Sequence, residues 1–119
     1  MKKILVVDDD PNICENLKLR LESSGYTVST ASNGVVAFVK ASEEKPDLII
    51  LDVCMPTMDG LKFVQATRWK MEMKDIPILI LTARVNTKEI FDTLGIDHFL
   101  TKPYDSKELL GMVAECVKS

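Results

Sequence analysis

The feature that most constrains the fold is a short, unbroken apolar run at residues 48–51, which ends at the carboxylate of Asp52. The run is too short for an ordinary helix and lacks the alternation of a half-exposed strand. It therefore predicts a strand buried on both faces of a parallel sheet. A charge directly after such a run costs free energy unless it reaches solvent, a metal or a cation. We therefore place Asp52 at the carboxyl end of that strand, the edge where open α/β sheets bind ligands.

Two other segments of the chain repeat this arrangement. Residues 4–7 form an apolar run that ends in the acids at 8–10, and residues 78–81 form one that ends in Thr82. Two less apolar segments also fit short strands, and the earlier of them belongs nearer the sheet edge. We therefore predict strands near residues 4–7, 26–30, 48–51, 78–81 and 97–100.

Helical segments separate the predicted strands. Asp10 followed by Pro11 is typical of a helix start, and apolar stripes at helical spacing run up to the glycines and prolines that end each segment. We predict helices near residues 11–24, 35–44, 61–73, 87–94 and 106–117. The second carries Val35, Phe38 and Val39 as its apolar residues. The third has two competing inward faces, between which the sequence does not decide: Leu61, Val64 and Arg68, or Phe63, Thr67 and Met71.

This alternation of strands and helices predicts an α/β fold. Short buried strands joined by helices are typical of a doubly wound, five-stranded parallel sheet with five helices distributed over both faces. Right-handed crossovers and short connections leave few topologies, and we expect the flavodoxin-like strand order 2-1-3-4-5. With 119 residues, the chain has the length of one domain, and no linker or repeat divides it. We expect residues 1–119 to form that domain.

Composition argues against several kinds of function. The net charge of −3 and the lack of a basic stripe argue against direct nucleic-acid binding. The three cysteines are widely spaced and form no Cys-x-x-Cys pair, which argues against a zinc site. No apolar run approaches the ~20 residues of a membrane span, and none resembles the core of a signal peptide. We expect a cytoplasmic protein with free thiols and no membrane partner.

The residues that leave the predicted strands at their carboxyl ends form a chemically coherent set: Asp8, Asp9, Asp52, Thr82 and Lys102. In the expected strand order these ends are neighbours at one sheet edge. Converging carboxylates repel, so they need raised pKa values or a cation, and an all-oxygen site favours Mg²⁺. A lysine and a hydroxyl beside an aspartate can bind the oxygens of an incoming phosphoryl group. The set therefore indicates phosphoryl transfer onto an aspartate.

Each residue at this edge also has a simpler explanation. Asp10 is better explained as a helix cap than as a ligand, and Asp8 and Asp9 equally fit acids that merely end a strand. Lys102 before Pro103 is typical of a turn, and threonine is common in strands. The agreement of several segments on one edge is what favours the functional interpretation.

Short motifs at these positions resemble one protein family. The motifs are ILVVDD at residues 4–9, LDVCMP at 51–56 followed by Asp59 and Gly60, LTA at 81–83, and LTKP at 100–103. Together they resemble the receiver domain of two-component response regulators, in the family's order and over essentially the whole chain. The resemblance implies that Asp52 accepts a phosphoryl group from a phosphohistidine on a sensor histidine kinase or a histidine phosphotransferase. It also implies a signalling domain rather than an enzyme.

The same resemblance implies a Mg²⁺ site. The carboxylates of Asp9 and Asp52 and the backbone carbonyl of Cys54 would bind the ion, and Asp8 would act through water or as a neighbouring acid. Bound Mg²⁺ would neutralise charge that develops on the phosphoryl oxygens.

On the phosphoryl side, the resemblance implies contacts from Lys102, the Thr82 hydroxyl and the Ala83 N–H. Phe99 would occupy the aromatic switch position, and the Lys102–Pro103 bond would be cis. Phosphorylation would draw Thr82 toward the phosphoryl group, let Phe99 turn inward and change the surface of the fourth helix, fifth strand and fifth helix. That surface would signal to a downstream protein or a fused output domain, from a monomer or a phosphorylation-linked dimer.

Some positions depart from the family pattern. Thr82 and Lys102 are 20 residues apart, slightly fewer than is usual, so the fourth helix or the loop before it should be short. Phe99 lacks the hydroxyl of the tyrosine often found there. Cys54 and Arg84 stand at positions where the family tunes the lifetime of the phosphoryl group, and the sequence assigns no rate to them.

Three rival functions share parts of this pattern. An aspartate-nucleophile phosphatase would carry a second acid at position 54, where this chain has Cys54. A degenerate receiver would bind partners without phosphorylation, which the complete set of acids, threonine and lysine argues against. A flavodoxin-like flavin binder would place a Ser/Thr-rich phosphate loop after residue 7, where acids would instead repel phosphate.

Overall fold

The strands of the fold follow the apolar runs of the sequence. The computed structural model describes residues 2–53, 58–70, 73–82, 92, 95–96 and 98–117. Within these residues the strands are β1 (Lys3–Val7), β2 (Thr27–Ala31), β3 (Leu48–Val53), β4 (Ile78–Thr82) and β5 (His98–Thr101). They pair in parallel in the order β2-β1-β3-β4-β5. The predicted flavodoxin-like order is confirmed.

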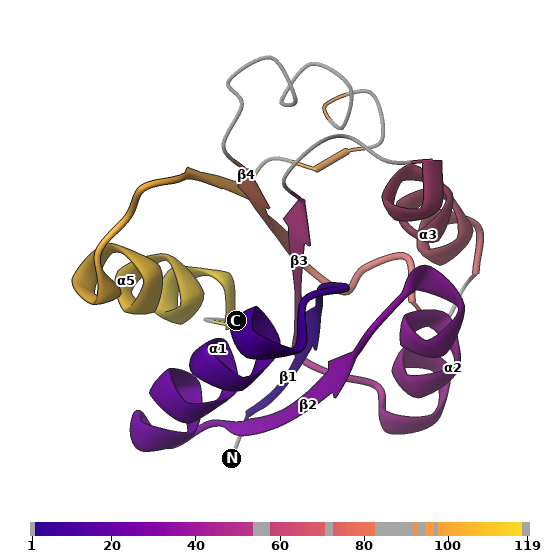
Figure 1. Cartoon of the computed structure of the whole chain (residues 1–119). Helices are drawn as coiled ribbons and strands as arrows, with labels where there is room; N and C mark the ends of the chain where they lie inside the picture. The colour runs from indigo at the N-terminus through magenta and orange to yellow at the C-terminus, as the bar shows by residue number, and fades with distance from the viewer. Residues whose placement is uncertain are drawn as a thin grey trace.

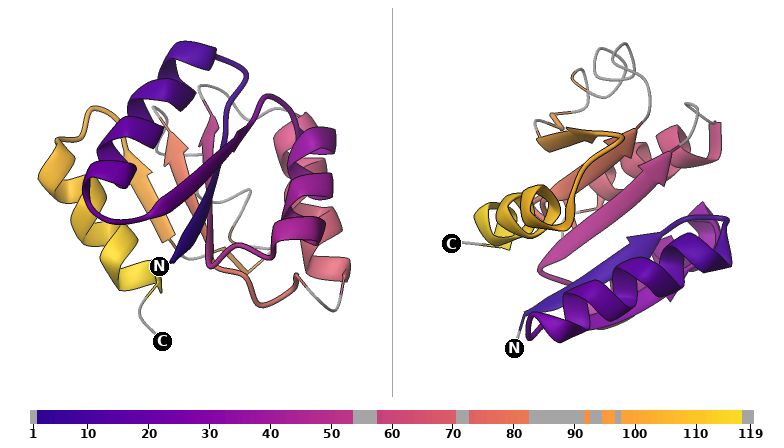
Figure 2. Two further views of the ribbon diagram at one scale, coloured as in Figure 1. Left: turned by 90° about the horizontal axis from the view of Figure 1, so that it is seen from below. Right: turned by 60° about the vertical axis from the view of Figure 1, so that its left-hand side comes forward.

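Helices cover both faces of this sheet. α1 (Pro11–Ser23) and α5 (Ser106–Val117) lie on one face, and α2 (Gly34–Glu44) and α3 (Met58–Trp69) lie on the other (Figure 1; Figure 2). Successive residues of β1 point to opposite faces of the sheet. Ile4 and Val6 pack under α1 and α5. Leu5 and Val7 pack under α2 and α3. Because β3 and β4 are also buried on both faces, their sequences read as continuous apolar runs.

Side-chain caps fix the starts of three described helices: α1, α2, where Asn33 Oδ1 accepts from the Val36 N–H, and α5. The Asn12 N–H donates to Asp10 Oδ1 at 2.9 Å, and Pro11 occupies the first helical position, as predicted for α1. At α5, the Glu108 N–H donates to Asp105 Oδ1 at 2.7 Å, and the Asp105 N–H donates back to the Glu108 carboxylate at 3.4 Å. This reciprocal pair is a capping box, so Asp105 is the cap of α5.

α2 turns a different side toward the sheet from the one its larger apolar residues suggest. Ala37 and Ala41 are fully buried, whereas Val35 and Val39 are exposed. Phe38 is only partly buried at the edge of the core. Small side chains let a helix lie close against a sheet without leaving voids. The apolar residues predicted for this helix are therefore largely a surface feature.

α3 buries residues from both of the inward faces that the sequence left open. The helix begins at Met58, earlier than the predicted residue 61, and ends at Trp69 rather than at residue 73. Among its described side chains, at residues 62–69, Phe63, Val64 and Thr67 are buried. The Thr67 hydroxyl donates to the Val64 carbonyl at 2.7 Å, which satisfies the buried polar group.

Part of the predicted architecture falls outside the residues that the structure describes. The fourth predicted helix, at residues 87–94, lies almost entirely outside them. The described residues form four helices, and among these no helix combines the length and apolar character needed to span a membrane.

Candidate functional site

The pairing of β1 with β3 brings two of the predicted site acids together. Val7 lies opposite Leu51, so the residues that follow them, Asp8 and Asp52, reach the same height at the sheet edge. Both side chains are buried, and the charge of Asp52 acts on Asp8. This is the carboxyl edge that α/β sheets use for ligands.

Lys102 reaches the same place from β5, across β4. Thr82, at the end of β4, lies opposite Thr101, and the Lys102 N–H donates to the Thr82 carbonyl at 2.7 Å. The Lys102 ammonium forms a hydrogen-bonded ion pair with Asp52 Oδ1. The Asp52 side chain is 1% exposed and the Lys102 side chain 23% exposed. Because the carboxylate lies out of water, its attraction to the ammonium is only weakly screened.

Asp8 is hydrogen-bonded to the backbone, but its buried position disfavours the charged form of its carboxyl group. Its Oδ1 accepts from the Asp10 N–H at 2.9 Å, and its own N–H donates to the Ala31 carbonyl at 3.1 Å. Burial raises the pKa of Asp8 from 3.8 to about 7; the Asp10 N–H opposes this rise, and Asp52 and Asp9 add to it. An ionised Asp8 is therefore costly, and a nearby cation would relieve that cost.

Two buried carboxylate oxygen atoms at this site are available as ligands for a metal ion. Asp8 Oδ2 and Asp52 Oδ2 have no hydrogen-bond partner among the described residues, although buried polar atoms are nearly always satisfied. Oxygens of adjacent carboxylates are suitable ligands for a hard cation such as Mg²⁺. Within the described chain, no three acidic, cysteine or histidine side chains gather at metal-binding distance, and Cys54 lies outside it. The donors present thus fit Mg²⁺ as part of a ligand set.

Thr82 and Phe99 are among the other predicted residues that the structure describes. Thr82 is buried at the end of β4. Phe99, on β5, is half-buried and packs against the core beneath α2 and α3. The Lys102–Pro103 bond is cis, as the resemblance implied. Ala83 lies outside the described residues.

A pocket of about 380 Å³ opens onto Asp52 and Lys102 beside α1, and Arg20 and Tyr104 are among the residues that line it. Neither residue was predicted from the sequence. Burial raises the pKa of Tyr104, the charge of Asp52 raises it further, and Lys102 and Arg20 lower it. The available signal for Tyr104 was its position, two residues beyond Lys102 at the same sheet edge.

Comparison with known proteins decides the family. The family model described as "Response regulator receiver domain" matches residues 4–114, from β1 into α5. The chain belongs to the response regulator receiver domain family.

Longer regulatory proteins contain domains similar to this receiver. It is 47% identical over 113 residues to the alkaline phosphatase synthesis transcriptional regulatory protein PhoP of Bacillus subtilis, covering 91% of this chain and 45% of that protein. It is 40% identical over 116 residues to the DNA-binding dual master transcriptional regulator RpaA of Synechocystis, covering 95% and 48%. The receiver chain thus spans about half the length of the curated relatives it matches.

Solved structures of other response regulators share its fold. The chemotaxis response regulator CheY4 of Vibrio cholerae has a TM-score of 0.88 and 36% identity, over 98% of each chain. The response regulator protein TrrA of Thermotoga maritima, solved in complex with Mg²⁺-BeF, has a TM-score of 0.84 and 39% identity, over 98% of this chain and 99% of that one. The receiver fold is therefore established by sequence and by structure together.

Proposed function

We propose that this receiver accepts a phosphoryl group on Asp52 from a phosphohistidine of a sensor histidine kinase or a histidine phosphotransferase. The observation that carries the proposal is the buried Asp52 carboxylate, paired through Oδ1 with Lys102 and adjacent to a second buried acid, Asp8. A carboxylate in this setting is a nucleophile with a cation already in position for the charge of the incoming group.

The transfer conserves the phosphoryl group and forms no free phosphate. An oxygen of Asp52 attacks phosphorus, the bond from phosphorus to the donor's imidazole nitrogen breaks with its electron pair left on nitrogen, and an acyl phosphate forms. Lys102 would then contact a phosphoryl oxygen, and the Thr82 hydroxyl would donate to another. The receiver supplies positioning and charge to this step. It acts as a signalling domain that is modified once in each cycle rather than as an enzyme with turnover.

The same site would hold Mg²⁺ through the carboxylates of Asp9 and Asp52, with the carbonyl of Cys54 as a further donor and Asp8 acting through water or as a neighbouring acid. When bound, the ion neutralises negative charge on the phosphoryl oxygens. Two observations support this assignment: the buried, unpaired Oδ2 atoms of Asp8 and Asp52, and the similar TrrA structure, which was solved in complex with Mg²⁺-BeF.

The phosphohistidine donor would approach through the pocket beside α1. Ile13 and Leu17 give this pocket an apolar side, and Asn16 and Arg20 give it polar contacts. An apolar surface with two cations, Arg20 and Lys102, suits a protein partner that presents a negatively charged phosphohistidine.

The output would be a change of surface on the side of β5. Phe99 lies on β5, three residues before Lys102, which directly follows that strand. A movement of Lys102 and Thr82 toward the phosphoryl group would therefore be passed to Phe99, α5 and the predicted fourth helix. A downstream protein or a fused output domain would recognise that surface. The receiver would act in the cytoplasm as a monomer or a phosphorylation-linked dimer. The regulators PhoP and RpaA, about twice as long as this chain, support an output domain.

Intact-protein mass spectrometry tests the proposal. The protein is incubated with acetyl phosphate, with and without Mg²⁺, as wild type, as Asp52→Asn and as Asp75→Asn. Asp75 is an exposed acid in the turn after α3 and serves as the matched control. We expect one Mg²⁺-dependent phosphoryl adduct on the wild type and on Asp75→Asn, and none on Asp52→Asn.

Two outcomes would contradict the assignment. An adduct of equal stoichiometry on Asp52→Asn would mean that another residue is the acceptor. No adduct on any protein, in either condition, would favour a receiver that binds its partner without phosphorylation.

A further inference from the structure

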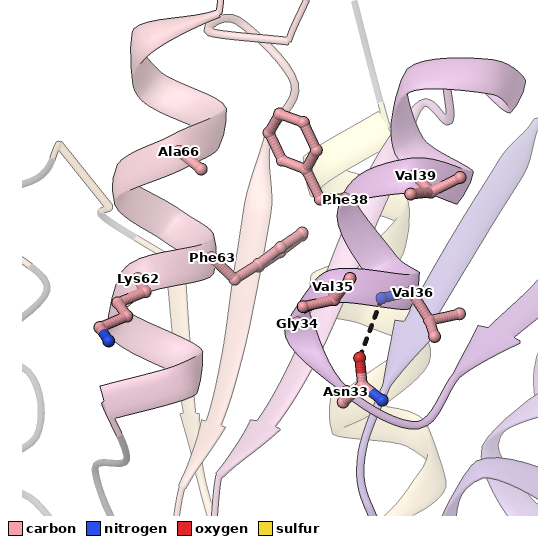
Figure 3. A pocket seen from close by; sticks show the side chains of 9 residues that line it. All are labelled: Asn33, Gly34, Val35, Val36, Phe38, Val39, Lys62, Phe63 and Ala66. Atoms are coloured by element: carbon pink, nitrogen blue, oxygen red, sulfur yellow. Dashed lines mark hydrogen bonds between the residues drawn. The ribbon is translucent and has the colours of Figure 1, made fainter.

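An apolar groove runs between α2 and α3, on the face of the sheet opposite α1 and α5. Phe38 of α2 and Phe63 of α3 point into the space between the two helices, with Val35 and Ala66 beside them (Figure 3). The groove has a volume of about 590 Å³. The phosphoryl-transfer chemistry proposed above uses none of these side chains.

Exposed apolar side chains concentrate around this groove. In the described part of the chain five large apolar side chains are exposed, and all of them except Leu19 of α1 lie on α2 or α3. Val35 is 76% exposed and Trp69 is 88% exposed. Because Lys62, Ala66 and Trp69 are spaced four and three residues apart on α3, they share one helical face, which extends the groove toward the end of the helix. Apolar surface gathered in one place marks a binding site better than scattered residues do.

Basic side chains stand at both ends of the groove. Lys62 lines one end. At the other end, Lys70 Nζ lies 5.3 Å from the centroid of the Phe38 ring and 3.5 Å from Ser42 Oγ. Lys62 is on α3 and Lys70 directly follows it, eight residues on, which corresponds to roughly 12 Å at the rise of a helix. The described residues that line the groove include no acid, and Glu43 of α2 is exposed outside it.

We propose that the groove between α2 and α3 docks an amphipathic helix of a partner protein, with its apolar face against Phe38 and Phe63 and two carboxylates spaced to meet Lys62 and Lys70. Neighbouring helices leave a straight valley between them, and a third helix fills such a valley by packing its ridges into it. The two basic ends select acidic residues about two helical turns apart on the bound helix.

A second copy of this chain fits the groove less well. A two-fold contact sets a patch against itself, so Lys62 and Lys70 of one molecule would face the same lysines of the other. Like charges across an interface disfavour association. The charge pattern therefore favours a different protein as the occupant.

Two synthetic helical peptides test the proposal against the full 119-residue chain. Both carry leucines along one face; one has glutamates seven residues apart at the edge of that face, and the other has lysines there. The fluorescence of Trp69, the one tryptophan of the chain, reports binding beside the groove. We expect saturable binding of the glutamate peptide and at least fivefold weaker binding of the lysine peptide.

Three variants locate the binding, with calorimetry as the readout. Val35→Glu should weaken binding of the glutamate peptide at least tenfold, because it places a carboxylate among the apolar contacts. The variant should still fold, because Val35 is exposed in the first turn of α2, where an acid suits the helix dipole. Lys62→Glu should weaken binding of the glutamate peptide roughly fivefold and strengthen binding of the lysine peptide. Leu19→Glu, the matched control on α1, should change neither.

Three results would overturn the proposal. The first is the absence of saturable binding of the glutamate peptide. The second is equal binding of the two peptides, or equal effects of Val35→Glu and Leu19→Glu. The third is self-association of the protein alone in sedimentation that Val35→Glu abolishes, which would make a second copy the occupant. Because none of these measurements uses phosphorylation, they stand apart from the test of Asp52.

Discussion

Replacing Asp8 by asparagine would remove a buried negative charge and keep the shape of the side chain. The asparagine carbonyl can still accept from the Asp10 N–H, which Asp8 Oδ1 accepts at 2.9 Å. Its amide also brings a donor to the position next to Asp52, whose buried Oδ2 has no hydrogen-bond partner among the described residues. We expect Asp8→Asn to raise the free energy of unfolding of the metal-free protein at pH 8.

The magnitude follows from the pKa of Asp8, which burial, and then Asp52 and Asp9, raise from 3.8 to about 7. Each unit of pKa is worth about 1.36 kcal/mol, so ionising Asp8 costs the folded state up to roughly 4 kcal/mol. Because the folded state holds this proton more tightly than the unfolded state, the cost is absent below about pH 4, grows up to about pH 7 and is constant above it. A weaker hydrogen bond from Asp10 to the neutral amide offsets part of the gain, which leaves about 1–3 kcal/mol for the variant at pH 8.

Urea unfolding in EDTA, followed by circular dichroism at pH 5 and pH 8, measures this difference. From pH 5 to pH 8, the free energy of unfolding of the wild type should fall by about 2–3 kcal/mol more than that of Asp8→Asn. Asp75→Asn, which changes an exposed acid, should follow the wild type. The reasoning is refuted if Asp8→Asn is no more stable than wild type at pH 8 and shows the same loss between pH 5 and pH 8.

Three further tests probe the ion pair, the core and a helix cap. Lys102→Ala should lower the free energy of unfolding at pH 8 by about 1–3 kcal/mol, because it leaves the buried Asp52 without its ammonium; an unchanged urea midpoint would contradict this. Leu109→Ala, at a fully buried position of α5, should lower the free energy of unfolding by about 2–4 kcal/mol, and Leu110→Ala should lower it clearly less. Equal losses for the two variants would show that the packing of α5 is misassigned. Asp105→Ala should cost about 1 kcal/mol in thermal unfolding, and Asp105→Ser should recover most of it if the cap is what matters.

The central strands were predictable because of where they lie. β3 and β4 are buried on both faces, so every position demands an apolar side chain and the runs are continuous. β2 is an edge strand, and its Thr27–Ala31 span is shifted by one residue from the predicted 26–30. With fewer buried positions, the sequence pattern marks its limits less sharply.

The orientation of α2 and the limits of α3 were harder to predict. Hydropathy ranks Val35 and Phe38 above Ala37 and Ala41, yet the alanines face the sheet because a helix packed closely against it has room only for small side chains. α3 buries the polar Thr67, whose hydroxyl is satisfied within its own helix. Neither fact is visible in the spacing of apolar residues alone.

The strand-borne part of the site was predictable, and the rest was not. Parallel pairing brings the ends of β1, β3 and β5 to one edge, so the proximity of Asp8, Asp52 and Lys102 follows from strand order. Arg20 and Tyr104 join the pocket from the far part of α1 and from the segment after β5. Their positions depend on how α1 and that segment pack, which strand order does not specify.

The ion pair between Lys102 and Asp52 joins residues 50 positions apart, and it spans β4, which separates β5 from β3 in the sheet. A chain folded only as far as β4 would carry Asp8 and Asp52 at its edge without the lysine that balances them. Contacts this distant in sequence carry a large entropic cost of loop closure, so we expect this one to form late in folding. The balanced pocket is thus a property of the finished fold, and an incompletely folded receiver would present two repelling acids in its place.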